Sequence, residues 1–213
     1  TADEIRGASD VEVTPVVADV STKDGQAAWL AACPRPELLV NNNGGPPFKD
    51  FRELDREAML AGVTMNMITP IELIQSVVDG MVERGFGRIV NITSISVKMS
   101  IPGLDLSSAA RAGLTGFVAG TSRQVAPQGV TINNLLPGIH ATSRADALDG
   151  AVVKAEGITL AEARAKRQAT IPARRYGTIA EFGATCAYLC SQQAGFIVGQ
   201  NILLDGGSVN STF

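Results

Sequence analysis

The sequence is poor in the residues that build metal centres and disulfide frameworks. It holds one histidine and three cysteines, Cys33, Cys186 and Cys190, in 213 residues. An odd number of cysteines leaves at least one unpaired, and their positions lack metal-ligand spacing. We therefore expect no metal site, and we interpret the cysteines as buried thiols in a reducing compartment such as the cytoplasm.

Long apolar runs and basic runs are also missing. No stretch of 18 apolar residues occurs, which argues against a transmembrane helix. The net charge is −3 and Lys and Arg form no run, so we expect neither nucleic acid nor a membrane surface as a partner. With 45% hydrophobic and 18% charged residues, the chain suits a single globular domain with a sizeable core.

Apolar strands alternate with amphipathic helices along the chain. Strands are expected at 11–20, 37–40, 87–92, 130–136 and 201–204. Helices are expected at 22–32, 51–84, 107–126 and 179–191. Pro15 lacks a backbone N–H and so places the first strand at an edge. This order predicts an α/β fold, a doubly wound parallel sheet with helices on both faces in three layers.

Polar residues and glycines follow three of the expected strands. Ligands bind outside the carboxyl ends of strands in such a sheet, so each group is a candidate site. The groups are Asn41-Asn42-Asn43-Gly44, Thr93-Ser94-Ile95-Ser96 and Pro137-Gly138-Ile139-His140-Ala141-Thr142. The alternative for the asparagine group is an ordinary surface turn.

One polar residue interrupts an otherwise apolar helix. Asn66 lies among methionines and Ile68, and Pro70 is expected to kink the helix just after it. Because a buried amide needs partners, Asn66 either bridges backbone groups or holds a water near the site. Farther along, Thr159 with Glu162 and Thr178 with Glu181 predict capping boxes at two helix starts.

Five short motifs in a fixed order resemble those of short-chain dehydrogenases and reductases. They are Asp19-Val20, Asn41 to Gly44, Gly87-Arg88-Ile89-Val90-Asn91-Ile92-Thr93-Ser94, Pro137-Gly138 and Asp205-Gly206-Gly207. The nearest resemblance is to members described as 3-oxoacyl-acyl-carrier-protein reductase-like. It implies a Rossmann-like sheet of about seven strands that binds NAD or NADP, usually in a homotetramer or homodimer.

The resemblance also implies roles for individual residues. Asp19 and Val20 would lie by the adenine, and the turn Asn41, Asn42, Asn43 and Gly44 would steady the central strand and the cofactor. Pro137, Gly138, Ile139 and Thr142 would surround the nicotinamide. Asn66 would hold a water, and Ser94 would hydrogen-bond the substrate carbonyl. A segment at 143–176 would cover the substrate within the single domain 1–213.

Two functional groups expected from the resemblance are replaced. The family's proton donor is a Tyr thirteen residues after the Ser, followed four residues later by a Lys. Counting from Ser94 gives Ser107 and Arg111 at these positions, and Arg111 could still hold the ribose. A Ser hydroxyl is a much weaker acid than a phenol, and Arg keeps its proton.

Substitute proton donors can be named from the same stretches. His140 and Lys98 are candidates; His140 is the only histidine, and histidine titrates near neutral pH. The alternative for His140 is a turn residue whose ring faces solvent, and for Lys98 a solvated loop charge. Tyr176 and Tyr188 are the only tyrosines, and neither matches the position of the catalytic Tyr.

The glycine-rich phosphate turn of the family, TGxxxGxG, is absent from the 213 residues. Because that turn follows the first strand, we expect the chain to be incomplete at its N-terminus. The expected missing part is one βαβ unit, about 30–50 residues, which also carries the choice between NAD and NADP.

Three functions are compatible with the sequence. The first is an NAD(P)-dependent oxidoreductase acting on a carbonyl or secondary alcohol of a small molecule, with an atypical proton donor. The second is a weak or inactive nucleotide-binding relative that serves as a sensor or scaffold, as the Ser107 and Arg111 replacements suggest. The third, a purely structural oligomer, rests only on small residues spaced along the helix at 107–126.

Overall fold

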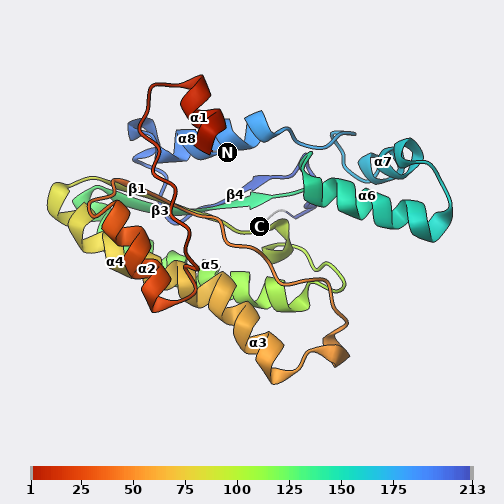
Figure 1. The fold of residues 1–213 in the computed structure, drawn as a ribbon, viewed down its shortest axis with the longest axis horizontal. Helices are drawn as coiled ribbons and strands as arrows, with labels where there is room; N and C mark the ends of the chain where they lie inside the picture. Colours follow the sequence, from red (N-terminus) through yellow and green to blue (C-terminus); the bar gives the residue numbers. More distant parts are fainter. Residues whose placement is uncertain (1, 212–213) are drawn as a thin grey trace.

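The computed structural model describes residues 2–211 and shows one parallel sheet (Figure 1). Its strands lie in the order β1-β2-β3-β4, and all neighbouring pairs are parallel. Their bounds are β1 Leu38–Asn41, β2 Gly87–Ile92, β3 Val130–Pro137 and β4 Asn201–Leu204. The expected strands at 37–40, 87–92, 130–136 and 201–204 are therefore confirmed to within one residue at either end.

Helices cover both faces of the sheet, which confirms the three-layer α/β fold. Helices α4 and α5 pack on one face and α8 on the other, as Figure 1 shows. The helices are α1 Ala2–Ala8, α2 Lys23–Ala32, α3 Arg56–Val63, α4 Thr69–Arg84, α5 Asp105–Val125, α6 Ser143–Glu156, α7 Leu160–Gln168 and α8 Ile179–Cys190. Both predicted capping boxes are present, at the starts of α7 and α8.

The core lies between the sheet and the pair of helices α4 and α5. Every residue of β2 is buried, as expected for a strand that is covered on both faces. Ile89 and Ile132 on the central strands pack with Met81 of α4 and with Leu114 and Val118 of α5. Burial of these side chains fixes both helices against the sheet and thereby fixes where the strand ends meet α5.

The expected strand at 11–20 is wrong. These residues form no strand, and Val11 and Val17 are exposed, whereas Val20 packs against the core. An isolated β pattern becomes a strand only when a neighbour completes its ladder of hydrogen bonds. Strand β1 pairs with β2 and with no segment of residues 11–20, so the pattern has no partner in the part that the structure describes.

The long helix expected at 51–84 is broken. It consists of a 3-10 turn at Phe51–Glu53, helix α3, a π-helical turn at Thr64–Ile68 and helix α4. Pro70 lies in the first turn of α4, where its missing N–H costs little. The π-helical turn holds the buried Asn66, so the irregularity expected near Pro70 begins before it.

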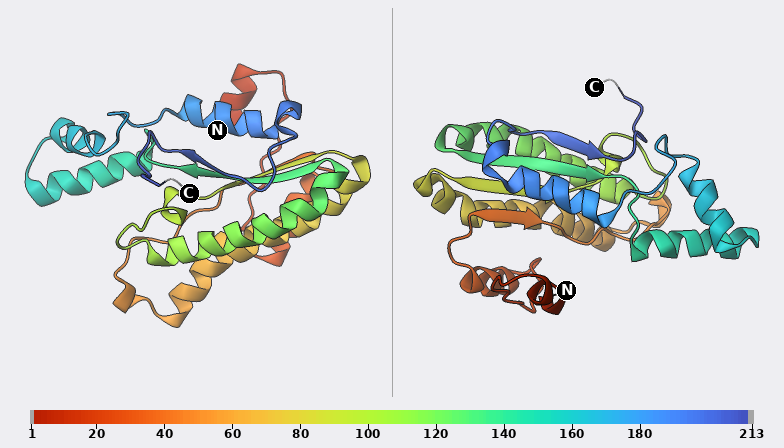
Figure 2. Two further views of the ribbon diagram at one scale, coloured as in Figure 1. Left: turned by 180° about the vertical axis from the view of Figure 1, so that it is seen from behind. Right: turned by 90° about the horizontal axis from the view of Figure 1, so that it is seen from above.

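Helices α6 and α7 extend beyond the end of the sheet (Figure 2). A small core of Ala145, Ile171 and Tyr176 holds this segment together. The carboxylate of Asp149 is fully buried there, accepts a hydrogen bond from the Tyr176 hydroxyl at 2.7 Å, and pairs with two arginines, Arg164 and Arg167. The segment is therefore an ordered unit and not a loose loop.

No helix within residues 2–211 is long and apolar enough to cross a membrane. Within the same residues, no group of three or more His, Cys, Asp or Glu side chains is placed to hold a metal ion. The three cysteines are free thiols; Cys33 is exposed and the other two are half-buried, so the expectation of buried thiols is wrong for Cys33.

Candidate functional site

A cavity of about 510 Å³ lies at the carboxyl ends of β2 and β3, and we call it the Ser94 cavity. The turn after β2, the start of α5, the turn after β3 and helix α6 all contribute to its wall. Of the predicted site residues, it brings together Ser94, Ser107, Arg111, Pro137, Gly138, Ile139 and Thr142. These residues come from segments that are far apart in the sequence.

Two hydroxyls of the cavity keep their protons free for donation. The Ser94 Oγ accepts a hydrogen bond from the Ser96 amide at 3.1 Å, and this bond caps the short 3-10 turn at Ile95–Val97. The buried Ser107 Oγ accepts one from Arg111 Nε at 3.2 Å, one helical turn farther along α5. Since both oxygens act as acceptors, each O–H can point toward a ligand.

Arg111 joins the helix to the sheet. Its Nη1 donates to the carbonyl oxygen of Ile92, the last residue of β2, at 2.8 Å. Burial, and then the neighbouring charge of Arg144, lower the pKa of Arg111 to about 10. The guanidinium therefore keeps its charge at neutral pH but lies in a site that disfavours positive charge.

Chain geometry holds the turn after β3 close to the end of β4. A Cβ on Gly138 would lie 2.8 Å from the Cα of Asp205, so only glycine fits this approach. The His140 ring also lines the cavity, with Nδ1 at 3.3 Å from the Gly138 oxygen and its edge against Phe182. Its Nε2 is buried without a hydrogen-bond partner, so the ring does not simply face solvent.

Lys98, the other suggested acid, lies outside the Ser94 cavity. It lines a neighbouring surface hollow together with Ser96 and Ser108. Of the two suggested substitute donors, only His140 lines the Ser94 cavity, but both of its ring nitrogens face the protein. Its Nδ1 lies beside the Gly138 oxygen, and its Nε2 is buried against Gly177.

Asn41 forms the start of a row of asparagines on one face of the sheet. The row crosses all four strands in register, through Asn91 and Asn134 to Asn201. Each Nδ2 donates to the next Oδ1, at 2.8, 3.0 and 2.8 Å in turn. Asn41 is thus a structural residue of the strand ends and does not line the Ser94 cavity.

Asn43 and Gly44 of the asparagine group are hydrogen-bonded to the π-helical turn at Thr64–Ile68. Asn42 is exposed, whereas Asn43 Nδ2 donates to the carbonyl oxygen of Met65 at 2.8 Å. Asn66 Nδ2 donates in return to the oxygen of Gly44 at 3.2 Å. Asn66 therefore bridges backbone groups and holds the turn after β1 against the π-helical turn. Its Oδ1 is buried without a hydrogen-bond partner.

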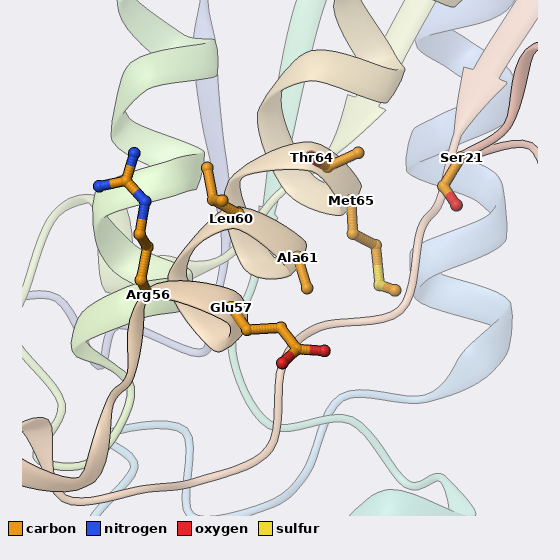
Figure 3. A pocket seen from close by; sticks show the side chains of 7 residues that line it. All are labelled: Ser21, Arg56, Glu57, Leu60, Ala61, Thr64 and Met65. Carbon is orange, nitrogen blue, oxygen red and sulfur yellow. The ribbon is translucent and has the colours of Figure 1, made fainter.

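A second cavity, of about 560 Å³, lies between α3 and the segment that carries Ser21; we call it the Met65 cavity. In Figure 3, the Met65 side chain extends toward Ser21, whereas the Arg56 side chain points away. Asp19, two residues before Ser21, is exposed and outside the lining. The Ser21 hydroxyl and then its amide donate to the Asp19 carboxylate and lower its pKa.

A smaller cavity of about 220 Å³ links the two larger ones. It shares Gly45 with the Ser94 cavity, and it shares Ala61 and Met65 with the Met65 cavity. The three hollows are therefore neighbours through the residues that they share.

Sequence reasoning missed several residues of the Ser94 cavity. Gly45 directly follows the asparagine group, and Arg144 lies two residues after Thr142, so each is adjacent to a predicted motif. Leu148 and Arg167 reach the cavity only because α6 and α7 fold over the strand ends. No local pattern in the sequence reports that packing.

Comparison with known proteins gives consistent matches along the chain. The family model described as enoyl-(acyl carrier protein) reductase matches residues 1–209. An acetoacetyl-CoA reductase of Cupriavidus necator is 35% identical over 171 residues, which is 80% of this chain and 65% of the relative. The chain thus spans just under two thirds of that relative's length.

Solved structures show the same fold. The NADPH-dependent reductase YwfH, involved in bacilysin biosynthesis, matches with a TM-score of 0.90 and 30% identity, over 98% of this chain and 82% of that one. A single-residue variant of the actinorhodin polyketide ketoreductase with NADPH matches with a TM-score of 0.87 and 29% identity, over the same shares.

Proposed function

The chain belongs to the short-chain dehydrogenase/reductase family, and we propose that it is an NAD(P)-dependent oxidoreductase acting on a carbonyl or a secondary alcohol. One observation carries the proposal. Two hydroxyls with free protons, Ser94 and Ser107, line a single cavity with the turn at 137–142 at the carboxyl edge of the sheet. Similar proteins whose names include NADPH support the cofactor.

The two ends of a dinucleotide can be assigned to different parts of the chain. We assign the nicotinamide end to Pro137, Gly138, Ile139 and Thr142, whose turn approaches β4 through a glycine that no other residue can replace. Arg111 would hold the ribose hydroxyls. The adenine end would lie near Asp19 and Val20, beside the Met65 cavity, with the turn Asn41, Asn42, Asn43 and Gly44 between the ends.

In this mechanism the protein binds and polarises the carbonyl. A bound reduced nicotinamide supplies the hydride that the carbonyl carbon accepts. Ser94 and Ser107 donate hydrogen bonds to the carbonyl oxygen, and Arg111 Nε, by donating to Ser107 Oγ, orients that hydroxyl. The oxygen then takes one proton from water through the Ser107 hydroxyl, so that a carbonyl becomes an alcohol.

A second function is favoured by the same positions. Serine is too weak an acid to match a phenol, and general acid catalysis contributes roughly 10²–10⁴-fold. A protein with Ser107 and Arg111 could therefore bind nucleotide as a sensor or scaffold and turn over slowly or not at all.

Binding and turnover separate the two functions. Affinity for NADH and NADPH is measured by nucleotide fluorescence, and turnover by absorbance over a panel of carbonyl compounds. The oxidoreductase proposal predicts both, and tight binding with no turnover on any compound contradicts it. Where turnover occurs, we expect Ser107→Ala to reduce kcat by about 10-fold or more, because a hydrogen bond to the developing oxyanion is lost.

Replacing both positions tests whether they limit the chemistry. The double variant Ser107→Tyr with Arg111→Lys should raise kcat for neutral carbonyls, by up to the factor of roughly 10²–10⁴ expected from a general acid. An unchanged rate would show that these two positions do not limit the chemistry.

The proposal also covers the substrate class, the oligomeric state and the cellular location of the protein. The acetoacetyl-CoA and polyketide relatives suggest a 3-oxoacyl thioester or another small carbonyl compound. We place the segment at 143–176 over the substrate, since Arg144 and Leu148 line the Ser94 cavity. A homotetramer or homodimer in the cytoplasm completes the proposed picture.

A further inference from the structure

Six large apolar side chains line the Ser94 cavity. They come from the segment after β1, the segment between β2 and α5, the turn after β3, and α6, and they are Phe48, Ile95, Ile101, Leu104, Ile139 and Leu148. Among the lining residues that the structure describes, none is Asp, Glu, Asn or Gln. A cavity with an apolar wall and few polar groups suits a ligand whose body is apolar.

The three arginines of the lining do not call for a charged substrate. Arg167 is already paired with the buried Asp149, its Nη1 lying 3.3 Å from the carboxylate. Arg144 is exposed, so water solvates its charge. Arg111 is held by Ser107 and Ile92, and we have assigned its remaining nitrogen to the ribose hydroxyls. The surface that is left for a substrate substituent is therefore apolar.

Backbone hydrogen bonds fix the position of Phe48. The amide of Lys49 donates to the carbonyl oxygen of Gly103 at 3.1 Å, which holds the segment after β1 against the turn before α5. Gly103 has a φ of +76°, and a Cβ there would lie 3.3 Å from Phe48 Cδ1. The glycine thus lets the ring lie close against the turn. An apolar surface that is positioned before the ligand arrives lowers the entropic cost of binding.

Four of the six apolar side chains remain open to water. Phe48 is 47% exposed although it lines the cavity, and Ile101, Leu104 and Leu148 are only half-buried. We call these four residues the Phe48 wall. Apolar surface that folding leaves in contact with water around a hollow is typical of a ligand site, because covering it is favourable.

The Phe48 wall begins beside the two hydroxyls of the site. Leu104 immediately precedes α5, and Ser107 lies in the first turn of this helix, three residues farther along. Ile95, which follows Ser94 in the chain, is buried beneath the same part of the cavity. A carbonyl that accepts hydrogen bonds from Ser94 and Ser107 therefore has its neighbouring substituent next to apolar side chains.

We propose that the substrate is a ketone or secondary alcohol that carries an alkyl chain or an aryl ring, and that this group lies against the Phe48 wall. The assignment rests on the proposed oxidoreductase function and narrows its substrate class. Ile139 belongs to the turn that we assign to the nicotinamide, so the substituent is left with the Phe48 wall. Polyhydroxylated ketones are poor substrates, because their hydroxyls lose water there without gaining partners.

A series of unbranched methyl ketones measures the preference. Steady-state reduction by NADH and NADPH is compared for 2-butanone, 2-pentanone, 2-hexanone and 2-octanone. We expect kcat/KM to rise by about 4-fold for each added methylene until the wall is covered. 4-Hydroxy-2-butanone, which matches 2-pentanone in size, should be reduced at least about 10-fold less efficiently. A rate that does not depend on chain length, or a preference for the hydroxy ketone, would overturn the proposal.

Variants of the wall show whether these residues cause the preference. Phe48→Ala and Leu148→Ala should each lower the ratio of kcat/KM for 2-octanone to that for 2-butanone by about 5-fold to 50-fold. Phe51→Ala is the matched control, because Phe51 is also exposed but lies outside the cavity, with its ring 4.4 Å from the Arg52 guanidinium. If both wall variants keep the parent's ratio, the Phe48 wall does not bind the substituent.

A binding experiment separates this inference from the proposed function. N-phenyl-1-naphthylamine, a neutral apolar dye without a carbonyl group, is titrated into the protein and followed by fluorescence. We expect Phe48→Ala and Leu148→Ala to weaken dye binding by about 5-fold or more, and Phe51→Ala to leave it unchanged. This result supports the apolar site even if no carbonyl compound is turned over. Turnover without chain-length dependence, together with dye binding that neither wall variant changes, overturns the site and leaves the oxidoreductase function standing.

Discussion

At the scale of single residues, two buried charges beside the cavity are handled differently. Asp149 is fully buried and is satisfied by Tyr176 and by the arginines of α7, one of which, Arg167, lines the Ser94 cavity. Arg111 is also buried, and it forms no ion pair within residues 2–211. The fold therefore neutralises one buried charge within itself and leaves the other without a counter-ion in the described part of the chain.

Tyr176→Phe should destabilise the protein. The change removes the 2.7 Å hydrogen bond to the buried Asp149 carboxylate, and an under-satisfied buried acceptor costs roughly 1–3 kcal/mol of unfolding free energy. Urea denaturation followed by circular dichroism measures the loss. Tyr188→Phe is the control, because Tyr188 is exposed on α8, and its unfolding free energy should stay within about 0.5 kcal/mol of the parent.

The Tyr176 phenol should also make the stability of the protein depend on pH in the alkaline range. Burial, and then the hydrogen bond to Asp149, raise the pKa of Tyr176 from 10.0 to about 12. A raised pKa means that this stabilisation is complete below pH 10.0 and is lost as the pH rises toward about 12. The fall in stability over this range should be smaller in Tyr176→Phe, and an identical profile would contradict the assignment.

The residues that define the chemistry were partly visible in the sequence. Ser94, Ser107 and Arg111 follow from counting along one stretch, and the structure brings them into one cavity. Arg144 and Gly45 were missed, because their significance comes from convergence in space. The spacing of residues in the sequence indicates which residues are neighbours on one helix or strand. It does not indicate which turns and helices pack together in the folded protein.

At the scale of elements, the asparagine row ties the four strands together, from the last residue of β1 to the first residue of β4. The two central amides, Asn91 and Asn134, each donate one hydrogen bond and accept another, so we infer that the row is cooperative across β1 to β4. It lies just before the turns that line the Ser94 cavity. We infer that it fixes the relative height of the strand ends and hence the shape of the site.

Asn91→Leu should lower the free energy of unfolding by more than a substitution at the end of the asparagine row does. It leaves Asn134 Oδ1 without its donor and Asn41 Nδ2 with only a 3.5 Å contact to the oxygen of Pro70. Two buried polar groups without good partners cost roughly 2–5 kcal/mol of unfolding free energy. Asn201→Leu affects one neighbour at a half-buried position and should cost about 1 kcal/mol. Equal losses in chemical denaturation would show that the row is not cooperative.

Secondary structure followed from the sequence where burial alone decides it. The strands β2 and β3 are apolar and covered on both faces, so their pattern is unambiguous. Residues 11–20 carry an equally good β pattern and form no strand, because pairing depends on a neighbour that the pattern does not contain. The π-helical turn at Thr64–Ile68 was missed because one extra residue in a helix leaves no local signal.

At the scale of the whole molecule, the side of α5 that carries Gly116 and Gly120 is a candidate surface for assembly. A Cβ on Gly113 would meet Met67 Sδ at 2.5 Å, so close packing within the chain explains this glycine. Nothing lies within 4 Å of a Cβ on Gly116 or Gly120. Glycine inside a helix costs roughly 0.5–1 kcal/mol relative to alanine, and no contact within the described chain compensates for these two.

A second copy packed against this side would account for the two glycines, and we expect the proposed homo-oligomer to use it. Gly116→Leu should then shift the protein to a smaller species in sedimentation velocity, because a bulky side chain holds the helices apart. The melting temperature of the parent should rise with protein concentration and that of the variant should not. Gly116→Ala serves as the matched change. If Gly116→Leu keeps the parent's mass and Gly116→Ala only stabilises it, by about 0.5–1 kcal/mol, the side faces solvent and assembly uses another surface.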